Sequence, residues 1–143
     1  MTGVQTCALP IYLYQLNDCV NGKKYLERVL EVDPDFCEAK KSIGYAYFAG
    51  ICTNNNTRAL EYLNGALDCM VKSGKTRGDD IDLLLWIGQA YHTRAAERQE
   101  AKQAKELYQK DYENADNFYS EVLKYQPNNV EAKEGFRQVK WEH

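Results

Sequence analysis

Apolar residues recur along most of this chain at the three- and four-residue spacing of a helix. Leu84, Ile87, Gly88 and Tyr91 follow the spacing i, i+3, i+4 and i+7, which places them on one helical stripe. Two further stripes have the same spacing, and the second is closed by a proline, which disfavours helix in the residue before it. These stripes are Ala59, Leu63, Ala66 and Leu67, and then Ala115, Tyr119, Val122 and Leu123 before Pro127. The pattern predicts an all-α fold.

The sequence also repeats itself. Residues 26–40 read LERVLEVDPDFCEAK and residues 119–133 read YSEVLKYQPNNVEAK, so one helix ends at a proline and another begins in each copy. The phrase IGYAYF at 43–48 returns as IGQAYH at 87–92. Self-similarity at such distances is typical of repeat architectures. Glycine in this stripe indicates a close approach of a neighbouring helix, so we expect Gly44 and Gly88 to lie at helix crossings.

The order of residues in these stripes resembles the tetratricopeptide repeat (TPR), a helix-turn-helix unit of about 34 residues. A large apolar residue, a Leu-Gly or Ile-Gly pair and a Tyr come first along the chain. An Ala, a large apolar residue, an Ala-Leu or Val-Leu pair and a Pro follow. The resemblance implies a helix-turn-helix repeat solenoid in one TPR-like domain over 12–141. Its register comprises a half-repeat at 12–36, a repeat at 37–80, an elongated repeat at 81–129 and a C-terminal capping helix at 130–141.

The elongated repeat carries a surplus of about 15 residues between Tyr91 and Ala115. No Gly or Pro interrupts residues 89–126, and the insertion is rich in strong helix formers. Extending both helices by about two turns accounts for the surplus and predicts a projecting hairpin that reverses near 98–101. The alternative is one continuous helix, which would leave Tyr119 and Val122 without their partner Tyr91.

Residues 1–11, MTGVQTCALPI, resemble a translated sequencing adapter. We therefore expect them to be a non-native scar, exclude them from the fold, and regard Cys7 as not biological. The alternative is a genuine N-terminus with a degenerate signal peptide, but the segment lacks a basic n-region. The native sequence upstream of Tyr12 is then expected to be missing, and a lost signal peptide stays an open alternative.

Charge and composition narrow the classes of partner. The 143 residues carry a formal net charge of -3, which offers no electrostatic reason to bind nucleic acid. No run of 18 apolar residues exists to span a membrane. The expected partner is a protein or peptide. A cytoplasmic location is favoured, and an exported or periplasmic one stays open because the native N-terminus is expected to be lost.

The residues that could carry chemistry are few. His92 and His143 are the only histidines, so a His-based metal site would lack ligands. No Ser/His/Asp grouping and no dinucleotide-binding fingerprint occurs, so we expect no metal, no cofactor and no enzyme activity. Residues 74–80, which read GKTRGDD, lack the earlier glycine of a phosphate-binding loop. We interpret them as an exposed loop in which Asp79 or Asp80 caps the next helix. The four cysteines other than Cys7 are expected as free thiols, with disulfides in an exported protein as the alternative.

The resemblance also implies where a partner would bind, because the first helices of successive repeats line a concave face in this family. The implied groove residues are Lys41, Tyr45, Phe48, Leu85, Gln89 and His92, with Glu38, Ala49, Asp82 and Thr93 at the remaining inward positions. Tyr45, Leu85 and Gln89 depart from the Lys and Asn pattern of members that grip a C-terminal carboxylate. An apolar peptide or helix fits this set better.

Three function classes follow from these features, in decreasing order of support. The first is a non-catalytic protein-interaction scaffold that binds a peptide or partner helix in the concave groove. The alternative is a regulatory or assembly segment of a larger enzyme or envelope protein. RNA binding is third, since the acidic balance offers no stripe of Lys and Arg.

Overall fold

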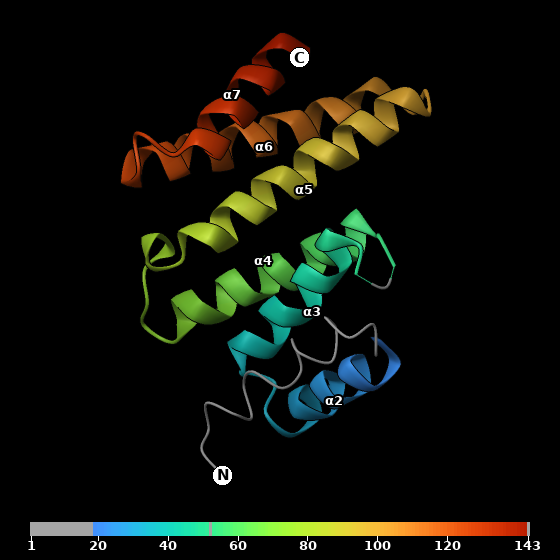
Figure 1. Ribbon diagram of the computed structural model, residues 1–143, viewed down its shortest axis with the longest axis vertical. Coiled ribbons are helices and arrows are strands. Elements are labelled where there is room, and N and C mark those ends of the chain that lie inside the picture. The colour runs from blue at the N-terminus through green and yellow to red at the C-terminus, as the bar shows by residue number, and fades with distance from the viewer. Residues whose placement is uncertain (1–18, 52, 143) are drawn as a thin grey trace. The chain divides into compact units, whose positions relative to one another are not determined.

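A computed structural model describes residues 19–51 and 53–142 (Figure 1). Every regular element in these ranges is helical, which confirms the all-α prediction. The expectation that residues 1–11 are an adapter scar lies outside the described residues. The helices are α2 (Cys19–Val32), α3 (Cys37–Ala49), α4 (Asn56–Lys72), the short 3-10 helix η1 (Arg77–Asp79), α5 (Ile81–Glu100), α6 (Lys105–Tyr125) and α7 (Val130–Glu142).

The chain divides into two compact units, and each is described here by itself. Unit 1 ends at Gly74 and holds α2, α3 and α4. Unit 2 begins at Lys75 and holds η1, α5, α6 and α7. The single TPR-like domain expected over 12–141 stays a prediction.

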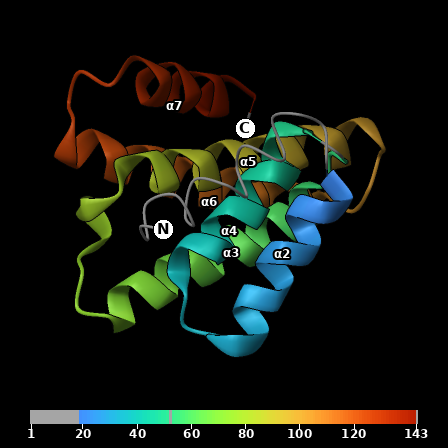
Figure 2. The ribbon, with the colours of Figure 1, turned by 60° about the horizontal axis from the view of Figure 1, so that its bottom comes forward.

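Unit 1 is built on the hairpin of α3 and α4, which lie side by side (Figure 1). Ile43 on α3 and Leu63 on α4 are fully buried between them. The helix α2 runs alongside α3 (Figure 2) and buries Leu26 against Ala39 and Ile43. The apolar stripes read from the sequence therefore form the core of this unit.

The connections in unit 1 follow from local chemistry. The helix α2 ends at Val32, two residues before Pro34, and α3 begins at Cys37. At the end of α3, Gly50 takes the left-handed conformation with φ 66°, which an L side chain rarely adopts. The Asn55 side chain then accepts a hydrogen bond of 3.0 Å from the Arg58 amide and caps α4.

A disulfide joins Cys37, the first residue of α3, to Cys69 in the last turn of α4. The expectation of free thiols is therefore wrong for this pair. The reason is the antiparallel hairpin, which brings the start of one helix beside the end of the next, with the two Cα atoms 5.6 Å apart. Cys52 and the side chain of Cys19 lie outside the described residues.

Unit 2 is built on the longer hairpin of α5 and α6, which confirms the hairpin over the continuous helix (Figure 1). The reversal occupies 101–104, about one turn beyond the predicted 98–101. Helix formers carry α5 to Glu100, and Lys102 then makes the turn in the left-handed conformation with φ 55°. On α6, Tyr112 and Ala115 are buried, whereas Leu107 near the tip is 46% exposed.

The ends of the hairpin in unit 2 are also fixed by side chains. Asp80 accepts a hydrogen bond of 3.1 Å from the Leu83 amide and caps α5, as predicted for Asp79 or Asp80. The last helix, α7, packs on α6 and contacts α5. It buries Ala132 and Val139, and Gly135 lies directly against the ring of Tyr119.

The two hairpins place their glycines in equivalent contacts. A Cβ atom on Gly44 would lie 2.7 Å from Cγ of Leu63, and one on Gly88 would lie 3.2 Å from Cδ1 of Tyr119. Leu63 and Tyr119 each follow by four residues the alanine that opens the second stripe of their repeat. The expectation that Gly44 and Gly88 lie at close helix crossings is confirmed.

The open ends of the two hairpins are tied in corresponding ways. In unit 1 the disulfide holds Cys69, six residues after Leu63, to the start of α3. In unit 2 Tyr125, six residues after Tyr119, lays its ring against Gly78 in η1, where a Cβ atom would meet Cζ at 2.7 Å. Each second helix is thus anchored beside the start of its first helix.

Candidate partner-binding surface

The face of α3 that the sequence assigned to the groove carries Lys41, Tyr45 and Phe48. These residues follow the spacing i, i+4 and i+7, so they share one side of the helix, and all three are half-buried. The Tyr45 and Phe48 rings are adjacent, with centroids 6.4 Å apart and planes tilted by 51°. Unit 1 therefore presents a small aromatic platform with a lysine one turn away.

The corresponding face of α5 is engaged within unit 2. Leu85 is only 4% exposed. The Gln89 side chain donates a hydrogen bond of 3.3 Å to Glu131 on α7. His92 lies on the α6 side, where its Nδ1 is 3.2 Å from the Tyr119 hydroxyl oxygen and its ring stands edge-on to that tyrosine.

The six predicted groove residues fall into two sets, one in each unit, and the four further inward positions are all exposed. Lys41, Tyr45 and Phe48 belong to unit 1, and Leu85, Gln89 and His92 belong to unit 2. The exposed positions are Glu38, Ala49, Asp82 and Thr93. The structure supports an accessible aromatic face on α3, whereas the α5 set contributes mainly to the packing of its own unit.

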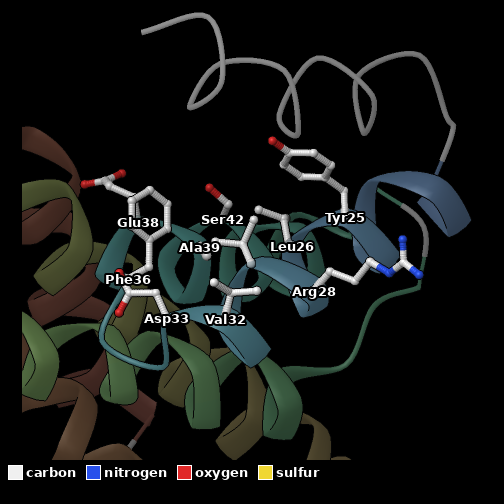
Figure 3. A pocket seen from close by; sticks show the side chains of 10 residues that line it. Tyr25, Leu26, Arg28, Val32, Asp33, Phe36, Glu38, Ala39 and Ser42 are labelled. Atoms are coloured by element: carbon white, nitrogen blue, oxygen red, sulfur yellow. The ribbon is translucent and has the colours of Figure 1, made fainter. Parts of the chain in front are cut away.

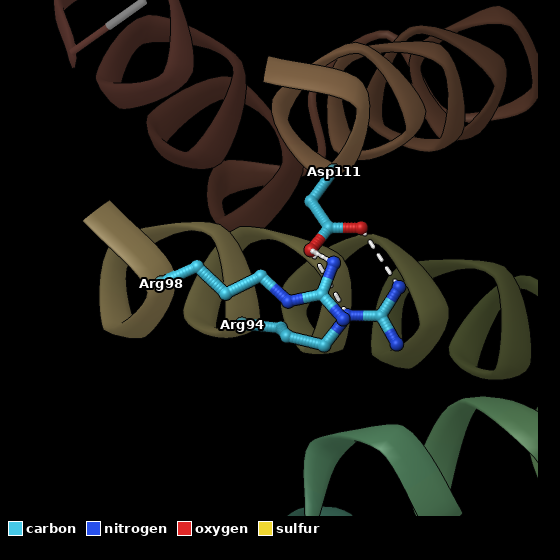
Figure 4. A network of polar contacts seen from close by, with 3 residues as sticks. All are labelled: Arg94, Arg98 and Asp111. Atoms are coloured by element: carbon cyan, nitrogen blue, oxygen red, sulfur yellow. Dashed lines mark hydrogen bonds and ion pairs between the residues drawn. The ribbon is translucent and has the colours of Figure 1, made fainter. Parts of the chain in front are cut away.

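A buried ionic cluster, which sequence reasoning missed, lies within the long hairpin (Figure 4). Asp111 on α6 is 2% exposed and accepts hydrogen bonds of 2.9 and 2.7 Å from Nε and Nη2 of Arg94. Arg98, one turn further along α5, donates a bond of 3.0 Å to the same carboxylate. The spacing of Arg94 and Arg98 places them on one helical face, but their partner depends on where the hairpin turns.

The cluster continues along the hairpin as aromatic and polar contacts. The Tyr112 hydroxyl donates a hydrogen bond of 2.8 Å to Gln99, and the Tyr112 ring lies edge-on to His92 with centroids 6.0 Å apart. Buried polar groups are costly unless they are paired, so these contacts favour one register of α5 against α6. This role is structural, and it accounts for the pairing of α5 with α6 along the insertion.

A second polar contact in unit 2 joins η1, which precedes α5, to the last part of α6. Arg77 of η1 donates two hydrogen bonds of 2.8 Å to the Glu121 carboxylate on α6. Its guanidinium carbon also lies 5.5 Å from the centroid of the Phe118 ring. The planar guanidinium group of arginine can donate two hydrogen bonds to a carboxylate and also stack on an aromatic ring. Arg77 therefore holds the loop before α5 against α6.

Near the start of unit 1, Lys23 interacts with the aromatic residues of the α3–α4 hairpin. Its Nζ lies 5.5 Å from the centroid of Tyr47, whose ring stacks on Tyr62. A hydrogen bond with Tyr47 raises the pKa of Lys23 above its ordinary value. The lysine is therefore a fixed positive charge that attaches α2 to the hairpin.

Among the described side chains, no group of three or more His, Cys, Asp or Glu residues is placed to hold a metal ion. Among the described helices, none has the length and apolarity needed to cross a membrane.

The sequence matches no protein-family model, and no curated protein matches it.

Proposed function

We propose that this chain is a non-catalytic interaction scaffold of TPR-like helical hairpins that binds a peptide or a partner helix. The observation that supports it most is the equivalence of the two hairpins. Gly44 meets Leu63 and Gly88 meets Tyr119 at the same two positions of the register. A structural unit that is repeated in this way provides surfaces for binding without requiring a catalytic site.

The face of α3 is the part of the groove best suited to binding. Tyr45 and Phe48 lie side by side and half-buried, and aromatic side chains supply large contact area at a low entropy cost. On α5, a partner would have to displace Glu131 from Gln89, a bond that is long at 3.3 Å. The proposed binding therefore depends first on Tyr45 and Phe48 of unit 1, and Gln89 of unit 2 is a separate candidate.

The experiment compares partner capture by the parent chain and by matched variants. Tyr45→Ala and Gln89→Ala should each weaken capture of the native partner, whereas Glu61→Ala on α4 should not. Glu61 is exposed and pairs with Arg58 over 3.6 Å, an interaction of little energetic weight. Recovery of the same partners in the same amounts by both groove variants would show that the groove assignment is wrong.

The alternative, an assembly or regulatory segment of a larger envelope protein, is favoured by one specific observation. The Cys37–Cys69 disulfide joins the two helices of the unit 1 hairpin. Structural disulfides persist in oxidising compartments and are rare where glutathione keeps thiols reduced. We therefore propose an exported or periplasmic setting for the scaffold, in place of the cytoplasmic one that the sequence favoured.

A further inference from the structure

A second surface of unit 1 is a groove between α2 and α3, and Glu38 alone among the residues assigned above to the concave groove lines it (Figure 3). It encloses about 500 Å³, and six of its ten lining residues are apolar or aromatic. They are Tyr25, Leu26, Val29, Val32, Phe36 and Ala39. Grooves of this size and character are typical binding sites.

An exposed apolar residue of α2 indicates that a partner covers this groove. Val32, the last residue of α2, lines the groove and is 88% exposed. Leu26 packs against α3 and also lines the groove, together with Val29. Apolar surface that is exposed along a groove marks an interaction site.

The charges at the groove are arranged by sign. Asp33 and Glu38 gather with Phe36 at the end next to the turn, and Arg28 lies at the opposite side (Figure 3). The N-terminus of a helix carries a partial positive charge, so the acidic end favours a helix that begins there. The α3 wall from Phe36 to Ser42 is roughly 10 Å long, which matches about two turns.

We propose that this groove binds an amphipathic helix of a partner protein. The helix begins at the acidic end with Lys or Arg in its first turn, presents an apolar stripe to Val29 and Phe36, and carries Asp or Glu near its last turn beside Arg28. This proposal rests on the proposed scaffold function and names a partner chemistry for it. It differs from the concave groove because Tyr45 and Phe48 do not line it.

The test uses the full chain and two stapled helical peptides with the same leucine stripe. One peptide has Lys and Arg in its first turn and Glu in its last turn, and the other has these charges exchanged. Fluorescence anisotropy at low salt should show the first peptide binding about three-fold or more tighter than the second, because its charges complement the groove. Glu38→Lys should abolish that preference.

Matched substitutions locate the binding. Val32→Glu should weaken the first peptide about ten-fold, and it should not unfold the chain because the side chain is 88% exposed. Val71→Glu, on α4 of the same unit at 45% exposure, should leave the affinity unchanged. Tyr45→Ala should also leave it unchanged, since Tyr45 belongs to the other surface.

Several results would overturn the inference. Equal affinity for both peptides together with an unaffected Val32→Glu variant would show that the groove does not bind them. A dimer in sedimentation that dissociates in Val32→Glu would identify a second copy as the occupant. Binding only after residues 12–18 are deleted would identify the chain's own segment instead. Loss of peptide binding in Tyr45→Ala but not in Val32→Glu would reject this groove while leaving the scaffold function standing.

Discussion

Single residues decide how closely the helices of each hairpin approach. At Gly44 the backbone nitrogen of Leu63 would lie 3.0 Å from an added Cβ atom, so the neighbouring helix itself, and not only a flexible side chain, occupies the space. Gly65 is also inside a helix of unit 1, but its nearest neighbour would be Cδ of Lys40 at 3.8 Å. The two glycines therefore have different physical roles.

These two positions make a matched test. Gly44→Ala should destabilise the protein by about 1–3 kcal/mol because the methyl group overpacks the crossing. Gly65→Ala should stabilise it by about 0.5–1 kcal/mol through helix propensity. Urea denaturation measures both changes. Gly74 is no suitable control, because its φ of 96° strains any L side chain. Equal effects of the two alanines would contradict the assigned crossing.

At the scale of elements, the long hairpin is held by one buried carboxylate. Asp111 is shared by Arg94 and Arg98, whose side chains are 18% and 24% exposed. Partial exposure to water lowers the free-energy cost of leaving the two arginines without a counter-charge. Loss of the three charge-assisted hydrogen bonds to Asp111 would still destabilise the hairpin. The pair of Arg77 and Glu121 offers a contrast in the same unit, since Arg77 is 43% exposed.

We expect Asp111→Asn to lower the free energy of unfolding by about 1–3 kcal/mol, because the two guanidinium groups lose their counter-charge. Glu121→Gln should lower it by less than about 1 kcal/mol, since exposed ion pairs contribute little. Guanidinium chloride would screen the charges, so urea is the denaturant of choice. If the two variants were equally stable, Asp111 would not have the assigned structural role.

At the scale of the whole molecule, the contacts of the chain divide between two units. The disulfide lies in unit 1 and the Asp111 cluster in unit 2, so a change at one should be felt first in its own unit. This division also bears on function, because the predicted groove residues come from both units whereas the α2–α3 groove belongs to unit 1 alone.

Reduction of the Cys37–Cys69 disulfide should destabilise unit 1 by about 3–4 kcal/mol, given a sequence separation of 32 residues. Hydrogen exchange should accelerate in α2, α3 and α4 and stay nearly unchanged in α5 and α6. A Cys37→Ser, Cys69→Ser double variant should show no response to reductant. Non-reducing peptide mapping should recover the two cysteines in one linked peptide, and two separate peptides would refute the disulfide.

The local pattern determined much of this protein. Helices begin at Cys37, Ile81 and Val130, the positions read from the sequence, because capping, proline and apolar spacing act within a few residues. The same short-range logic predicted Gly44 and Gly88 at helix crossings, since each lies on an apolar stripe. The hairpin in the insertion was also predicted, although its turn was placed about one helical turn too early.

Only the tertiary structure decided which distant residues meet. The disulfide between Cys37 and Cys69 and the pairing of Asp111 with Arg94 both depend on how far each helix runs before the chain reverses. The groove between α2 and α3 likewise exists only once the two helices are packed. Spacing along a chain fixes the face of a helix on which a residue lies, but the partner across a hairpin changes with every residue added to or removed from the turn.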